Sequence, residues 1–290
     1  MIPARNLSVV ISLAASLVAV GCVGSTGSSL VTFDAAAAGP ADAKEGQGYA
    51  FTSGRGYHVA LTCARLHVGA VYLNRSLPTS GAQDTDCILP GFYVAEVTQG
   101  LDVDVLSPRP QPFPGKGQGT ADRAEVGEVW LTHGDVNAPD DPGVVLDLAG
   151  TAELGGASYP FQGQLTIGKN RATPVADPSL PSANPICKQR IVSPILNDRA
   201  PTSAGIDITP RNGGSLLLRV DPSGWFSNVD FQKLGQASRL TAGPCAGAGT
   251  DPPRYTFADT AADPASNNLY SGIRYLSTVY HFSWNDSPKP

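Results

Sequence analysis

Short runs of alternating apolar and polar residues follow one another from about residue 50 to residue 284. The clearest case is 144–167, where two such runs are joined by Gly155 and Gly156. Because glycine adopts the positive φ angles of tight hairpin turns, this segment predicts a β-hairpin. The other runs cover 57–73, 92–97, 101–106, 124–133, 215–220 and 273–284. Roughly eight to eleven short strands separated by turns predict an all-β fold, an antiparallel β-sandwich with long loops rich in proline and glycine.

Two local features interrupt this alternation. The apolar phase of 57–73 shifts near Ala64 and Arg65, which predicts a β-bulge in a long strand. Asp221 followed by Pro222 begins a segment that ends at Phe226, and this order is typical of an Asp-capped turn or short helix.

Composition supports the β assignment and excludes other classes. Only 16% of the residues are charged, against about 25% in ordinary soluble domains, while Gly (32) and Pro (25) are abundant, which excludes a coiled coil. Apolar residues make up 41%, too many for a disordered chain. The net charge of −5 and the pI near 5.3 argue against a nucleic-acid partner.

The first residues have the pattern of an export signal. Arg5 precedes an uncharged apolar run from Leu7 to Gly21. At about 15 residues, this run matches the apolar region of a signal peptide and is shorter than the roughly 20 residues of a membrane span. The alternative is an uncleaved anchor.

The end of this run, Leu17-Val18-Ala19-Val20-Gly21-Cys22, resembles the lipobox of bacterial lipoproteins. The resemblance implies cleavage after Gly21 and a diacylglyceryl thioether on Cys22, so that the lipid bilayer is a partner. Two or three acyl chains would hold the protein stably at a membrane. Val23, which is not Asp, implies the outer membrane, facing the periplasm or the cell surface. The alternative is an ordinary signal peptide that is cut nearby.

The cysteine count agrees with this interpretation. The chain has five cysteines, an odd number. If Cys22 carries the lipid, four remain, and four cysteines allow three disulfide pairings. We expect the sequential pairing, Cys63–Cys87 and Cys187–Cys245, in an oxidising compartment outside the cytoplasm. The alternative is four buried thiols. The chain has no CxxC motif that would indicate zinc or thioredoxin-type chemistry.

These patterns divide the chain into three parts. Residues 1–21 are the expected lipoprotein signal peptide, 22–48 a flexible tether rich in Gly, Ser and Ala, and 49–287 a single β-sandwich domain. The alternative for part of the tether is an edge strand at 29–33.

Catalytic signatures are absent from the sequence: it contains no GxSxG, HExxH, P-loop or GxGxxG motif. We therefore expect no enzyme. One candidate site is the loop 134–143, whose carboxylate and amide oxygens suit Ca²⁺. Its candidate ligands are Asp135, Asn137, Asp140 and Asp141. The alternative is a plain turn, since Asp, Asn, Pro and Gly all favour turns.

Histidines offer a second candidate metal site. Imidazole suits copper, and His58, His67 and His133 lie in or beside predicted strands. His58 and His67 face opposite sides of a regular strand, but a bulge near Arg65 would bring them to one side. The alternative is that these are ordinary surface or hydrogen-bonded histidines.

Two segments resemble the methanobactin-associated periplasmic copper-binding proteins. These are Gly56 to Leu73 and Gly214 to Phe226. The resemblance implies an exported β-sandwich and, in some members, copper held by His and a modified Trp. This chain departs from that pattern because it has no His-rich stretch and no His beside a Trp.

The leading hypothesis is a membrane-anchored extracytoplasmic lipoprotein with a non-catalytic binding or structural role. The second is a periplasmic copper-binding protein that uses the histidines above. The third is a hydrolase whose site has no sequence signature.

Overall fold

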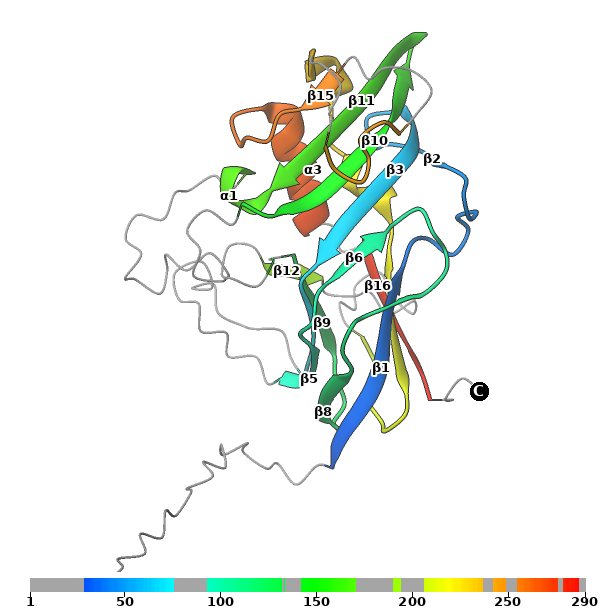
Figure 1. Ribbon diagram of the computed structural model, residues 1–290, viewed down its shortest axis with the longest axis vertical. Helices are drawn as coiled ribbons and strands as arrows, with labels where there is room; N and C mark the ends of the chain where they lie inside the picture. Colours follow the sequence, from blue (N-terminus) through cyan, green and yellow to red (C-terminus); the bar gives the residue numbers. More distant parts are fainter. Residues whose placement is uncertain are drawn as a thin grey trace, which may run out of the picture.

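The computed structural model describes residues 29–75, 93–131, 133, 142–170, 190–193, 206–236, 242–248, 255–275 and 279–286. Strands dominate this part of the chain, and they form two sheets that lie toward opposite ends of the molecule (Figure 1). The predicted all-β, sandwich-like fold is confirmed.

The first sheet holds nine strands within the described residues. In spatial order they are β12 (Arg190–Ser193), β9 (Val126–Trp130), β4 (Ala70–Asn74), β5 (Tyr93–Val97), β8 (Gly117–Thr120), β1 (Leu30–Ala38), β13 (Ser215–Val220) and β16 (Tyr280–Asn285), while β7 (Gln111–Pro112) pairs with β1. The pair β1–β13 is parallel and the other pairs are antiparallel.

The second sheet holds seven strands within the same part of the chain. They are β14 (Gly235–Gln236), β15 (Tyr255–Phe257), β11 (Ala157–Thr166), β10 (Val144–Leu154), β3 (His58–Val68) and β2 (Tyr49–Thr52) in spatial order, while β6 (Leu101–Asp104) pairs with β3. The predicted hairpin is β10–β11, and Gly155 and Gly156 turn it at φ 59° and 83°. Because β11 and β15 run parallel, this sheet is mixed, not purely antiparallel.

The long strand β3 continues through Gly69 into β4 and so joins the two sheets. Its pairing with β10 shifts register between Cys63 and Leu61, which leaves Thr62 as the extra residue of a bulge. Val59 and Leu61 are buried before the bulge, and Ala64, Leu66 and Val68 after it. The predicted bulge is therefore confirmed, two residues before Ala64. One apolar core runs under both sheets.

The short helices are α1 (Ile167–Asn170), η3 (Pro222–Phe226), η4 (Phe231–Lys233) and α3 (Pro264–Tyr275). As predicted, Asp221 caps η3, because its carboxylate accepts a hydrogen bond from the Ser223 amide at 2.8 Å. None of the helices in the described residues is long and apolar enough to cross a membrane.

The prediction of a flexible tether over residues 22–48 is wrong for residues 30–38. These residues form β1, which lies between β8 and β13 and so is not an edge strand either. Val31, Phe33, Ala35 and Ala37 alternate with more exposed residues and are buried. The run of alanines looked like a linker, but small side chains also suit a closely packed strand.

The prediction of β structure over residues 273–284 is wrong for residues 273–275. Residues up to Tyr275 belong to α3, and only β16, from Tyr280, is a strand. The Asp263 carboxylate accepts a hydrogen bond from the Ser266 amide at 2.8 Å, and Pro264 follows it in the first turn. This Asp-Pro start is a sequence signal for a helix.

The expected cysteine pairing is also wrong, because Cys63 forms a disulfide with Cys245. The two residues are 182 positions apart, and the bond ties β3 to the segment 242–248. Sequence order alone could not reveal this contact, since it depends on how that segment folds over β10. Cys22, Cys87 and Cys187 lie outside the described residues.

Candidate functional site

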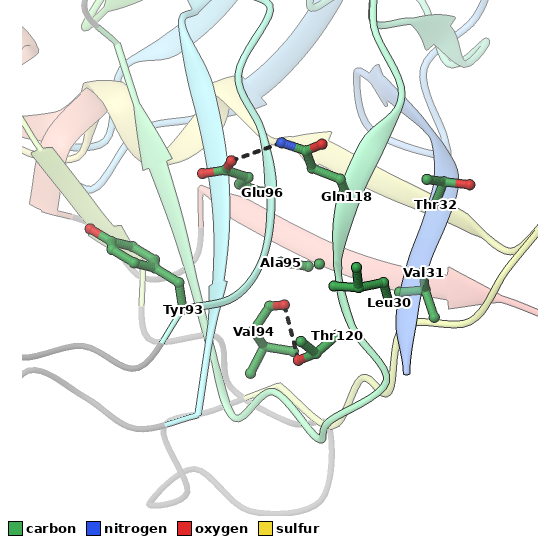
Figure 2. Close-up of a pocket in the computed structure, with 10 residues that line it drawn as sticks. Leu30, Val31, Thr32, Tyr93, Val94, Ala95, Glu96, Gln118 and Thr120 are labelled. Atoms are coloured by element: carbon green, nitrogen blue, oxygen red, sulfur yellow. Dashed lines mark hydrogen bonds between the residues drawn. The ribbon is translucent and has the colours of Figure 1, made fainter. Parts of the chain in front are cut away.

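An open pocket of about 470 Å³ lies on the first sheet, where β1, β8 and β5 run side by side (Figure 2). Its size falls within the range of ordinary ligand pockets, roughly 300–1,000 Å³. The lining residues are Leu30, Val31, Thr32, Tyr93, Val94, Ala95, Glu96, Gln118, Gly119 and Thr120.

The strand register places the pocket's polar side chains in one row. Thr32 pairs with Gln118, and Gln118 pairs with Glu96. Because paired residues across a sheet share a face, these three side chains lie on the same side. Leu30, two residues before Thr32, shares that side, whereas Val31 is buried on the other.

Glycine allows the strands to approach closely beneath this pocket. A Cβ atom on Gly119 would collide with the carbonyl oxygen of Val94 and the side chain of Ala95. The Thr120 hydroxyl donates a hydrogen bond to the same Val94 carbonyl at 3.4 Å. Backbone and small side chains thus contribute much of the lining.

The pocket has one charged lining residue. The Glu96 carboxylate accepts a hydrogen bond from the Gln118 side-chain amide at 3.2 Å, as the dashed line in Figure 2 marks. Apolar and small side chains provide most of the remaining surface. Such a lining suits an apolar group with a cationic or neutral polar end better than an acid.

Aromatic rings extend from the pocket toward β9. The Tyr93 and Tyr72 rings lie 5.1 Å apart between centroids, and the Tyr72 and Trp130 rings 4.8 Å apart. Burial, with the charge of Glu96 as the next cause, raises the pKa of Tyr72 to about 12. Tyr72 is therefore neutral at physiological pH.

Large exposed apolar side chains gather at this site. Leu30 is 71% exposed and Tyr93 is 48% exposed, and both line the pocket. The only other such residue among those described, Val144 at 38%, lies on β10 in the second sheet. None of the residues that line this pocket carries a recognisable sequence motif. The one signal that could have found it is Leu30, an apolar residue on the exposed phase of β1.

Two of the candidate metal ligands come together, but in an arrangement unsuited to sharing a metal ion. The His67 and His133 rings stack with centroids 3.6 Å apart and planes 10° apart. Their lone pairs lie in the ring planes, so they do not converge on one ion at about 2 Å. His67 Nδ1 also lies 2.6 Å from the Asp102 carboxylate, and His133 Nε2 2.9 Å from the Val144 carbonyl oxygen.

His58 lies at the other end of β3 from His67. The bulge does place both on the outer face of the strand, as expected, but about nine residues of strand put roughly 30 Å between them. Asp135, Asn137, Asp140 and Asp141 lie outside the described residues. Across the described residues no three His, Cys, Asp or Glu side chains form a group that could hold a metal ion.

A buried carboxylate lies beneath the disulfide. Asp147 is 3% exposed and accepts hydrogen bonds from the Gln164 side-chain amide at 3.0 Å and the Cys245 amide at 3.4 Å. Its other oxygen, Oδ1, has no hydrogen-bond partner. Burial is the main cause that raises the pKa of Asp147, and the hydrogen bonds from Gln164 and Cys245 oppose it.

We expect Asp147→Asn to stabilise the protein at neutral pH. Because the pKa of Asp147 is raised in the folded state, ionisation of this carboxylate destabilises the fold as pH rises above its unfolded pKa, about 3.9. An amide removes this cost, which is about 1.4 kcal/mol for each unit of pKa difference. Urea unfolding at several pH values should show that the advantage of the variant grows from about pH 4 upward.

Asp34→Asn is the matched control, since Asp34 is an exposed carboxylate that pairs with Lys116 on the surface. We expect that variant to stay within about 0.5 kcal/mol of wild type. An Asp147→Asn variant less stable than wild type at pH 8 and equal to it at pH 4 would contradict this account of the buried carboxylate.

Comparison with protein-family models, curated proteins and solved structures found no match.

Proposed function

We propose that this protein is an extracytoplasmic lipoprotein, anchored to a membrane by acylated Cys22, with a non-catalytic binding role. The observation that carries the proposal is the disulfide between Cys63 and Cys245. Disulfides persist in oxidising compartments and are rare in the cytoplasm, so this bond supports export. The lipobox-like sequence before Cys22 provides the signal for both export and acylation.

The segment that would connect the acylated Cys22 to the folded domain is short. Because β1 begins at Leu30, only residues 23–29 separate Cys22 from the first strand. Fully extended, the eight steps from Cys22 to Leu30 span at most about 28 Å. The domain would therefore lie close to the bilayer, with the start of β1 toward it.

The pocket supports binding in preference to catalysis. Its one carboxylate, Glu96, is hydrogen-bonded to an amide, and the rest of the lining provides no nucleophile paired with a base. An open pocket with an apolar surface and a few polar groups is typical of a ligand site.

Cys22→Ser should release the protein from the membrane fraction. The substitution removes the thiol that carries the lipid, and without acyl chains the chain has no stable hold on the bilayer. We expect most wild-type protein in the membrane fraction and at least about tenfold less of the variant there, measured by fractionation and immunoblotting.

Ser25→Ala is the matched control, because it changes the same segment and keeps the thiol. It should stay in the membrane fraction. Equal membrane retention of wild type and Cys22→Ser, with both chains correctly processed, would refute the proposed anchor.

A further inference from the structure

The pocket lies where the chain enters the folded domain. Leu30, the first residue of β1, is also one of its lining residues. Since the segment from Cys22 to Leu30 spans at most about 28 Å, the pocket cannot be far from a bilayer that holds Cys22. This step rests on the proposed function.

The exposed side chains of the pocket suit a membrane interface. Leu30 offers an apolar group and Tyr93 an aromatic ring with a polar end. Tyrosine is enriched at the level of lipid headgroups because its ring is amphipathic. Two exposed residues of this kind beside one pocket suit contact with lipid better than with water.

Charge indicates which lipid the pocket would accept. The Glu96 carboxylate would repel the phosphate of an anionic lipid and attract an ammonium group. The faces of the Tyr93 and Tyr72 rings, 5.1 Å apart between centroids, also favour a cation nearby. The net charge of −5 on the whole chain works against anionic surfaces as well.

We propose that this pocket binds an acyl chain of a zwitterionic phospholipid from the bilayer to which Cys22 anchors the protein. The acyl chain lies against Leu30 and the backbone of β8. The ammonium group of the headgroup lies beside Glu96 and Tyr93. The short tether keeps the pocket at the surface of that bilayer.

The test is photocrosslinking in phosphatidylcholine vesicles that contain a phosphatidylcholine with a diazirine on its acyl chain. The protein is the mature, acylated chain, and labelled peptides are mapped by mass spectrometry. We expect labels in residues 30–32 and 93–96. Leu30→Asp should reduce the label in 93–96 by roughly tenfold, because a charge replaces an apolar contact with lipid.

Val144→Asp is the matched control, since Val144 is also exposed but lies in the other sheet. It should leave the labelling unchanged. Leu30 is so exposed that its substitution should not disturb folding, and circular dichroism verifies this. Labels spread over both sheets, or labels in 93–96 that Leu30→Asp does not reduce, would overturn the proposal.

Two further experiments distinguish loss of the membrane anchor from loss of lipid binding in the pocket, and test the choice of headgroup. The Cys22→Ser chain mixed with the same vesicles should still label 30–32 and 93–96, though more weakly, so that loss of the anchor is distinguished from loss of the pocket. Replacing half of the phosphatidylcholine with phosphatidylglycerol should lower the labelling of wild type, and Glu96→Gln should reduce this difference. Equal or stronger labelling of wild type with phosphatidylglycerol would overturn the headgroup assignment.

Discussion

Replacing Cys63 and Cys245 together with serine should lower the free energy of unfolding by about 5 kcal/mol. The bond closes a loop of 182 residues, and a cross-link of this length removes much conformational entropy from the unfolded chain. It also holds the segment 242–248 over β10, where the Cys245 amide donates a hydrogen bond to the Asp147 carboxylate at 3.4 Å. Guanidinium unfolding of oxidised wild type and the double variant measures the difference.

Cys22→Ser serves as the control, because it removes a cysteine that this bond does not use. Its midpoint of unfolding should match that of wild type. A double variant as stable as wild type would show that the disulfide does not constrain the unfolded chain as its loop length requires.

Phe226→Ala should destabilise the protein by about 3–5 kcal/mol, the range for a large aromatic residue removed from a core. Phe226 is fully buried, and its ring lies within 5.7–6.4 Å of those of Phe51, Phe161, Phe231 and Phe257. Its removal would leave a cavity where η3 packs against the second sheet. Thermal and urea unfolding both measure the loss.

Tyr93→Ala is the comparison, because Tyr93 is aromatic but half exposed at the pocket. We expect it to cost less than about 1 kcal/mol. If the two substitutions had equal effects, the cluster around Phe226 would not be the tightly packed part of the core.

Several local features of the fold were predicted from the sequence, although the start of α3 at Pro264 was missed. The β10–β11 hairpin followed from Gly155 and Gly156, and the cap of η3 from Asp221, because each depends on neighbouring residues. The bulge in β3 followed from the change in apolar phase and was placed within two residues of Thr62.

Long-range contacts could not be predicted in the same way. The Cys63–Cys245 bond depends on segments that meet only after folding. The position of β1 between β8 and β13 depends on partners far along the chain, and its alanines carry little periodic signal. The pocket needs Leu30, Tyr93 and Gln118 from three strands, so no local motif indicates it.

The candidate metal ligands show the same limit. Sequence spacing alone placed His58 and His67 on opposite faces of a regular strand, and the expected bulge did bring them to one face. The neighbour of His67 is instead His133, whose ring stacks on it and whose Nε2 lies 2.9 Å from the Val144 carbonyl oxygen. A stack of two rings is a result of packing that spacing alone does not reveal.

Mass spectrometry of the mature N-terminus tests the central claim most directly. The account predicts that the protein begins at Cys22 and that this residue carries the added mass of a diacylglyceryl group. Treatment with a lipase should remove mass from the same peptide, and the peptide should be absent from the Cys22→Ser chain. A mature protein with an unmodified Cys22, or one that begins after residue 22, would contradict the account.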